Sequence, residues 1–533
     1  MFDTAYAGLD EAGLLAAIEQ ASQEEAAAGA RKLAAIAELV YSTVDEDDER
    51  GDWAYDPWKN ASALVGAALT VSQKRASGQM RIAVALRGRL PKIAALLCQG
   101  RLSPRLISEI TWRTQLVADD VVAMVDAALA DRAVTWGPLS DEKLVRSIEA
   151  VIDRYDPDAV RRAQEVIATR DLHIGAHDDP NELAAIWGKL LAGDAAVLKA
   201  RVVAMVKALC DNDPRSAGER RSAAMGAIAH GNEHLACRCG SPGCTATGPA
   251  KSHVVISVLA DPAAVEAAQE LIAVQDREQA AKTAERSTSA ITSNDESAEV
   301  EQEPAVPGTE NAGREMPACL RDSGVALLPG AHVLPIVALA EAIRDGAAIK
   351  RLWLPGPDPE PHYRPSAKLA AFIRARDVFC RFPGCDVPAE RCDIDHVVPY
   401  PYGPTHASNM NCKCRTHHVG KTFWEGWRDQ QLPDGTVIWT DPTGRSYTTM
   451  PGSRLFFPSW NVTTAELPPM AAPPPDPDRL VKMPKRRRTR AAENAARITA
   501  EREANAIQRE VEKRPANPGA EPPPDYGNDP PPF

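Results

Sequence analysis

Apolar residues recur at three- and four-residue steps through most of the first half of the chain, which is the period of an amphipathic helix. In residues 10–44 these positions include Leu14, Ile18 and Val40. Ser103-Pro104 reads as a helix N-cap followed by proline at the first helical position. The same pattern predicts further helices with connections of a few residues, over residues 60–98 with a break at Leu90-Pro91, and over 104–116, 119–134, 141–154 and 181–211.

Shorter stretches of alternating residues interrupt the helical pattern. Residues 170–178 and 252–260 each predict a strand. After Lys421, two or three short strands are expected, because Pro433-Asp434-Gly435 and Pro442-Thr443-Gly444 mark turns. The tryptophans of this region, at positions 424, 427 and 439, are expected to pack in a small domain rather than stack on bases, since such domains need aromatic area.

Composition shifts divide the chain into five segments. Residues 276–316 are rich in Glu, Ser, Thr, Ala and Pro and have no apolar period, which predicts a disordered linker. The full division is a helical domain at 10–275, this linker, a connecting helical segment at 317–360, a small domain at 361–455, and a largely disordered Pro-rich and basic tail at 456–533 that includes a helix over 491–513. The expected fold is therefore mainly α in the N-terminal region with a few strands, followed by a small α+β domain.

The composition narrows the class of protein. The chain has 533 residues, a net charge of −12 and 11 cysteines. No run approaches the ~18 apolar residues of a membrane helix, so no membrane association is expected. The N-terminus has neither the basic nor the apolar region of an export signal, which makes a reducing, cytoplasmic location the expectation. In that setting clustered cysteines favour metal binding over disulfides.

Cysteine and histidine spacing predicts a structural zinc site near residue 400. Cys380 and Cys385 form a C-x4-C pair, and Cys414 and His417 form a C-x2-H pair. Two close pairs of soft donors are what a tetrahedral zinc site requires. The alternatives for these four residues are ordinary buried thiols or a disulfide. Cys392 and Cys412 are spare thiols nearby, and they are either small buried side chains or replacements for one of the four ligands.

A second cluster of thiols lies earlier, in the segment HLACRCGSPGC that ends at Cys244. Cys237, Cys239 and Cys244 are close enough to form a second zinc site, with His234 or His253 as a fourth ligand. The C-x-C spacing is less diagnostic than C-x2-C, so plain loop cysteines are an equal alternative.

Between the zinc pairs stand residues suited to phosphodiester hydrolysis. Asp395-His396 follows an apolar, strand-like stretch, Asn409 comes after a turn, and His418 lies at the start of a predicted helix. This order resembles the HNH nuclease family, whose core is a β-hairpin and a helix that grip one divalent ion. The zinc pairs resemble the subgroup in which a zinc knuckle holds that core together. The whole architecture looks like bacterial HNH-endonuclease-domain proteins whose N-terminal helical domain has no assigned function.

The resemblance implies a role for each of these residues. His396 would be the general base, Asp395 and His418 would hold Mg²⁺ or a similar ion, and Asn409 would orient the base across the loop. Such chemistry needs an activated water and positive charge on the developing phosphorane. Adjacent His417 and His418 point about 100° apart on a helix, so one can face zinc and the other the catalytic ion. The sequence departs from the family at Lys413, where an apolar residue is usual.

Charge around the motif agrees with a nucleic-acid partner. From residue 362 to 428 there are ten Lys/Arg and six Asp/Glu, a net of +4 within an acidic chain. A local basic patch is sufficient for binding DNA. The candidate phosphate contacts are Arg374, Arg376, Arg381, Arg415 and Lys421. The basic run at 482–490 would attract phosphates or be a solvated tail.

These observations predict an enzyme, a metal-dependent HNH endonuclease that hydrolyses DNA. The alternative is a non-catalytic, zinc-stapled nucleic-acid-binding protein, favoured by Lys413 and the spare thiols. The helical domain is also a candidate module for self-association.

Overall fold

The computed structural model describes most of the chain and divides it into two units. The first unit comprises Met1–Asp171, Thr422–Trp424 and Pro477–Phe533, and the second comprises Leu172–Lys421 and Glu425–Asp476. The described residues are 5–45, 47–136, 139–162, 172–174, 186–188, 190, 192–241, 243–246, 258–291, 324–328, 332–344, 347–471, 473–474, 476 and 478–513.

Helices make up the first unit. They are α1 (Glu11–Thr43), α2 (Pro57–Leu69), α3 (Gln73–Gly88), α4 (Pro91–Cys98), α5 (Pro104–Arg113), α6 (Val122–Ala133) and α7 (Asp141–Tyr155), with short 3₁₀ turns η1 (Glu49–Asp52), η2 (Thr114–Leu116) and η3 (Pro157–Ala159). The expected cap is present, because the Ser103 side chain accepts from the backbone N–H of Leu106 and Pro104 opens α5. Residues 60–98 form parts of three helices: the expected break at Leu90-Pro91 separates α3 from α4, and a left-handed residue, Thr70, which was not foreseen, ends α2.

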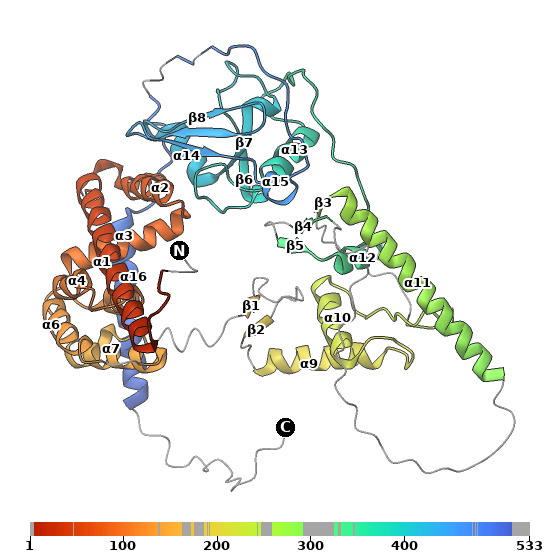
Figure 1. The fold of residues 1–533 in the computed structure, drawn as a ribbon, viewed down its shortest axis with the longest axis horizontal. Coiled ribbons are helices and arrows are strands. Elements are labelled where there is room, and N and C mark those ends of the chain that lie inside the picture. The colour runs from red at the N-terminus through yellow and green to blue at the C-terminus, as the bar shows by residue number, and fades with distance from the viewer. Residues whose placement is uncertain are drawn as a thin grey trace, which may run out of the picture. The chain divides into compact units, whose positions relative to one another are not determined.

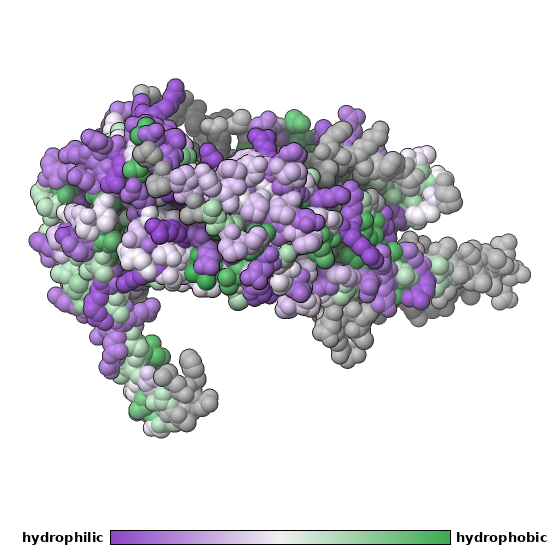
Figure 2. Space-filling model, turned by 90° about the horizontal axis from the view of Figure 1, so that it is seen from above, coloured by the Kyte–Doolittle hydropathy of each residue, from purple (hydrophilic) through white to green (hydrophobic). Residues whose placement is uncertain are grey.

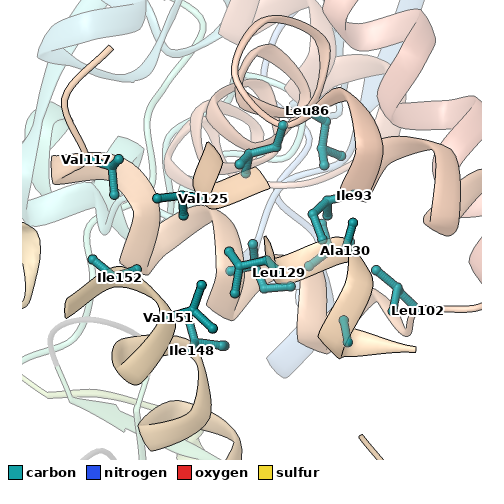
Figure 3. Close-up of a cluster of buried hydrophobic side chains, with 14 of the residues drawn as sticks. Leu86, Ile93, Leu102, Val117, Val125, Leu129, Ala130, Ile148, Val151 and Ile152 are labelled. Atoms are coloured by element: carbon teal, nitrogen blue, oxygen red, sulfur yellow. The ribbon is translucent and has the colours of Figure 1, made fainter. Parts of the chain in front are cut away.

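A cluster of buried aliphatic residues holds these helices together (Figure 3). It joins side chains from α3 to α7, among them Leu86, Ile93, Val125, Leu129 and Ile148. The C-terminal half of α1 contributes small side chains, including Ala26 and Ala30. The N-terminal half was expected to share this apolar face, and here the expectation is wrong. Leu14 is 39% and Ile18 64% exposed.

Helix α16 (Arg490–Lys513) belongs to the same unit although it lies more than 300 residues further along the chain. In Figure 1 it runs among the red and orange helices, and it contacts η1, η2 and η3. The helix expected over 491–513 is thus present. Its contact is partly apolar, through Ile498 against the aliphatic cluster, and partly polar: Asn505 is fully buried and donates to the backbone oxygen of Asp158 at 3.1 Å.

The second unit begins with small sheets and helices. Strands β1 (Leu172–Ile174) and β2 (Ile186–Gly188) pair antiparallel, followed by α9 (Ala192–Lys207) and α10 (Ala217–Ala229). A three-stranded sheet in the order β3-β4-β5 joins β3 (Leu259–Ala260), β4 (Ala326–Leu328) and β5 (His332–Leu334), and α11 (Pro262–Ile291) packs against α12 (Ile336–Arg344).

Two boundaries in this part differ from the sequence-based expectation. The helix expected from residue 181 starts at Ala192, because residues 186–188 pair as a strand. The linker was expected from residue 276, whereas α11 continues to Ile291. Residues 276–291 are rich in Ala, Glu, Gln and Arg, which are good helix formers. The remainder of the expected linker, 292–316, lies outside the described residues.

The small α+β domain of the second unit contains the elements expected around residue 400. Helix α13 (Ala367–Asp377) precedes a hairpin of β6 (Cys392–His396) and β7 (Met410–Cys414), which leads directly into α14 (Arg415–Phe423). The hairpin register pairs Cys392 with Cys414 and His396 with Met410. A sheet in the order β10-β9-β8 follows, from β8 (Arg428–Gln431), β9 (Val437–Thr440) and β10 (Ser446–Thr449), and then α15 (Ser453–Phe456).

Aromatic packing supports this domain as expected for two of the three tryptophans, whereas Trp424 belongs to the first unit and packs edge-on to Tyr55. Trp427 is 3% and Trp439 0% exposed, and both rings lie edge-on to Phe382. The indole N–H of Trp439 donates to the backbone oxygen of Arg381 at 2.7 Å. The fold class is therefore confirmed, with a mainly helical N-terminal region and small antiparallel sheets toward the C-terminus.

The surface is mixed in polarity. On the face drawn in Figure 2, hydrophilic residues predominate and hydrophobic ones are scattered among them. Among the described helices, none combines the length and apolarity needed to span a bilayer.

Candidate functional site

Three cysteines and one histidine of the small domain converge on one point. The ligand atoms of Cys380, Cys385, Cys414 and His417 all lie within 4.8 Å of one another. The Nδ1 atom of His417 is 3.5 Å from the Cys380 sulfur and 3.2 Å from the Cys414 sulfur. Gly384, at φ +71°, makes the turn that returns the chain to Cys385. This is the set that the paired spacing predicted.

The chemistry of this donor set fits a tetrahedral zinc ion. The thiols of Cys380 and Cys414 and the His417 ring are buried, so negative sulfur atoms there need a cation. The ring of His417 stacks on Phe382 at 3.8 Å between centroids, which fixes its orientation. Cys392 and Cys412 are buried outside the set, and Cys392 contacts the Pro388 backbone oxygen at 3.3 Å. Cys392 also contacts the thiol of Cys380, so it borders the metal-binding group, whereas Cys412 is fully buried.

On the other side of α14, His418 approaches Asp395 of β6. Its Nε2 atom lies 3.4 Å from Oδ1 of Asp395, and its Nδ1 atom lies 2.8 Å from Oδ2 of Asp393. The Asp393 contact orients the imidazole, as a second carboxylate commonly does for a metal-binding histidine. The hydrogen bond with Asp395 raises the pKa of His418 despite burial. Asp395 and His418 are thus close enough to bind one cation together.

His396 follows Asp395 on β6 and is 5% exposed. Its Nε2 atom lies 3.0 Å from the hydroxyl of Thr405, and its ring stacks on Tyr363 with centroids 5.4 Å apart. Burial lowers the pKa of His396, which favours the neutral imidazole. Thr405 and Tyr363 were not identified from the sequence.

Asn409 is fully buried behind this histidine and holds the intervening loop. Its carbonyl oxygen accepts from the backbone N–H of Val398 at 2.9 Å. Its amide donates to the backbone oxygens of Val398 at 3.0 Å and Pro404 at 2.9 Å. The three bonds close the loop that carries Thr405, so Asn409 positions the partner of His396 from behind.

Two lysines that sequence reasoning did not place at the site surround Asp395. Lys413 is fully buried, with its Nζ atom 2.8 Å from Asp429 and 3.2 Å from Oδ2 of Asp395. Lys421 lies 2.8 Å from the same Oδ2 atom and 3.1 Å from Asp429. Burial opposes the charge of Asp395, but the two lysines and His418 outweigh it and hold its pKa well below the usual range.

This network corrects several expected phosphate contacts. Lys421 is turned inward, with its side chain 11% exposed. Arg376 is 1% exposed and binds Asp377 and the backbone oxygens of residues 407 and 410. Arg381 is 3% exposed and binds backbone oxygens of residues 435, 449 and 450. Arg374 is half-buried, and Arg415 has a side chain that is 73% exposed.

The second predicted cysteine cluster also assembles, with a different fourth member. Cys210, Cys237, Cys239 and Cys244 bring their sulfur atoms within 4.8 Å of one another. His234, one of the two histidines considered, is outside the group, and the other, His253, lies outside the described residues. Cys210 stands 27 residues before Cys237, too far for a spacing pattern to connect them.

The basic run at 482–490 is in part committed to the first unit. Arg486 and Arg490 both bind the buried carboxylate of Asp56, each at 2.9 Å. Lys485 lies 3.1 Å from Asp52. Arg487 and Arg488 remain exposed, so only part of this run presents positive charge to solvent.

Comparison with known proteins places the chain in a family. A "Domain of unknown function (DUF222)" matches residues 20–302. "Uncharacterized protein Rv3776" of Mycobacterium tuberculosis strain H37Rv is 50% identical over 508 residues, 94% of this chain and 91% of that protein. "Uncharacterized protein MT2160" of strain CDC 1551 is 50% identical over 502 residues, 93% and 88% of the two chains. No solved structure matches. Because the match spans more than half of its length, the chain belongs to the DUF222 family.

Proposed function

We propose that this protein is a metal-dependent endonuclease that hydrolyses phosphodiester bonds in DNA, with the β6-β7-α14 unit as its catalytic centre. The observation that carries the proposal is the approach of His418 Nε2 to Asp395 Oδ1 at 3.4 Å, directly beside the buried His396. Adjacent ligands of an octahedral ion at 2.0–2.1 Å are about 2.9 Å apart, so a shift of about half an ångström would let both atoms bind one ion.

Asp395 and His418 would hold the divalent ion, which supplies positive charge to the scissile phosphate. His396 takes the proton of the attacking water, since a neutral imidazole with a pKa below neutrality can accept one. The Thr405 hydroxyl contacts the Nε2 atom of that ring, and Asn409 holds the loop on which Thr405 lies. The five side chains come from a hairpin, its loop and one helix, which gives the site a rigid support.

The two lysines are compatible with this arrangement because they use only one oxygen of the carboxylate. Lys413 and Lys421 both bind Oδ2 of Asp395, whereas His418 approaches Oδ1. The carboxylate can therefore bridge the lysines and a cation. Asp429 neutralises part of the lysine charge at 2.8 and 3.1 Å.

DNA as the substrate is favoured by the positive charge of the small domain. Arg415 is exposed at the start of α14, next to the proposed ion ligands. Arg364, which precedes α13, and Lys368, in the first turn of α13, are also exposed. Such side chains bind phosphates without regard to sequence and make affinity depend on salt.

The alternative function is a zinc-stapled nucleic-acid-binding module without catalysis. The buried Lys413 favours it, because a positive charge 3.2 Å from Asp395 lowers the affinity of that carboxylate for a cation. This alternative predicts salt-sensitive DNA binding with no cleavage in any divalent ion.

A plasmid assay with purified full-length protein separates the two. Wild type, His396→Ala and His418→Ala are incubated with supercoiled plasmid in Mg²⁺ or Mn²⁺. His230→Ala, an exposed histidine far from the site in sequence, is the matched control. Nicking that is retained by the control and lost in both site variants supports the nuclease. Equal nicking by wild type and His396→Ala removes the enzyme proposal, and binding without nicking leaves the alternative.

A further inference from the structure

The loops that follow α9 and α10 bring four thiols to one point, far in sequence from the proposed catalytic centre. The sulfur atoms of Cys210 and Cys237 are 3.3 Å apart, and those of Cys239 and Cys244 complete a group within 4.8 Å. We propose that these four cysteines bind a structural zinc ion on which the folding of the α9–α10 region depends. The site is independent of the nuclease proposal.

Backbone amides at the cluster point toward the cysteine sulfur atoms. The amide of residue 212 donates to the Cys210 sulfur, the amide of Cys239 to the Cys237 sulfur, and the amide of Ser241 to the Cys239 sulfur. Three of the four sulfur atoms thus accept from the amide two residues further along, and Gly240, with φ +69°, assists the turn around Cys239. Amide donors aimed at sulfur stabilise the anionic form that zinc requires.

Charged neighbours compensate for the sulfur atoms. Four thiolates around Zn²⁺ carry a net charge of about −2. Arg215 donates to the backbone oxygen of Ala236 at 2.8 Å, immediately before Cys237, and its guanidinium is fixed by the buried Asp213. Asp213 also accepts from the backbone N–H of Arg238 at 3.0 Å. This pair of contacts holds an arginine beside the cluster and ties the C-x-C loop to the end of α9.

The donor set assigns the role of the ion. Four thiolates fill a tetrahedral zinc shell and leave no position for water or substrate, so the ion is structural. The apolar core here is small, with five buried members, Met205, Leu209, Ala224, Leu235 and Cys237 itself. A core of this size does not stabilise two helices alone, and metal binding free energy then becomes folding free energy.

Metal counting on the full-length protein tests the proposal. Native mass spectrometry of wild type should give about two zinc ions per chain, one for each cysteine-containing group. Cys210→Ser should reduce this by one ion, and Cys385→Ser should remove the other. Cys98→Ser, an exposed cysteine of α4, is the matched control and should keep both. Retention of both ions in Cys210→Ser, or a single ion in wild type that Cys385→Ser abolishes, overturns the proposal.

Cobalt substitution reports which donors each site supplies. In Cys385→Ser loaded with Co²⁺, the sulfur-to-metal absorption should report four thiolates, and in Cys210→Ser it should report three. If Cys210→Ser fails to fold, stepwise chelation of wild type decides. Hydrogen exchange should rise first in peptides of α9 and α10 while those of α3 to α7 stay protected. Unchanged exchange on zinc loss, or two disulfides in the zinc-free native protein, contradicts the inference.

Discussion

Asn409 offers the sharpest test of how the proposed catalytic histidine is positioned. Asn409→Asp keeps the acceptor that binds the Val398 N–H but replaces the amide that donates to the oxygens of Val398 and Pro404. Each buried carbonyl left without a donor costs about 1–3 kcal/mol, so the loop should lose about 2–6 kcal/mol. The same substitution at the exposed Asn461, which uses only its acceptor, should change stability by less than about 0.5 kcal/mol.

Hydrogen exchange of peptides covering β6, the loop and β7 measures the loss locally, and zinc content verifies that the domain remains assembled. Plasmid nicking should fall about 10–100-fold, the usual effect of removing a residue that orients a catalytic group. The loss of stability should also depend on pH. Burial against two carbonyls raises the folded-state pKa of the introduced carboxyl above its unfolded value of about 3.9. The loss of stability is therefore complete above the folded-state pKa and becomes smaller as the pH falls through that value.

Equal protection of the loop in Asn409→Asp and Asn461→Asp would refute the argument that the Asn409 amide holds the loop. Normal protection combined with lost nicking would assign Asn409 a direct part in the reaction instead. Lost protection with full nicking would show that His396 needs no support from Thr405.

Three further predictions address buried charge elsewhere in the chain. Lys413→Met should destabilise the small domain by about 3–5 kcal/mol in urea unfolding, because Asp429 loses a buried partner. The double variant Lys413→Met, Asp429→Asn should recover part of that loss. Asp56→Ala removes the cap of α2 and the shared partner of two tail arginines, so hydrogen exchange should rise in both α2 and α16. Burial raises the pKa of Asp126, so the stability of wild type relative to Asp126→Asn should increase as pH falls from 7 toward 4; a flat difference contradicts this.

Local signals in the sequence determined most of the secondary structure. Ser103-Pro104 placed the start of α5 correctly because capping depends on residues within one turn. The Asp-His pair, the later Asn and the C-x2-H pair likewise located β6, the loop and α14, since the spacing of these residues is fixed by the hairpin itself. The four members of the Cys/His group of this domain were predictable for the same reason.

Contacts between distant residues were not predictable in this way. Cys210 completes its cluster from the end of α9, and no spacing rule links it to the C-x-C loop. Arg376 looked like a phosphate ligand by composition, but it binds Asp377 and two backbone oxygens in the core. Arg486 shows the same limit, since its partner Asp56 lies about 430 residues earlier. Charge count alone does not distinguish a buried arginine from an exposed one.

The balance of charge around Asp395 determines which of the two proposed functions is physically reasonable. Lys413 and Lys421 contribute +2, and Asp395 and Asp429 contribute −2, so the inner network is neutral. Asp393 lies 2.8 Å from His418 and adds one negative charge, and the exposed Arg415 lies 3.4 Å from the same carboxylate oxygen. The groups around Asp395 Oδ1 and His418 therefore carry no excess of positive charge, although Lys413 occupies a position that the resemblance would fill with an apolar residue. The buried lysine thus fixes the carboxylate without making the site cationic, so its presence is compatible with the cation binding that the proposed enzyme requires.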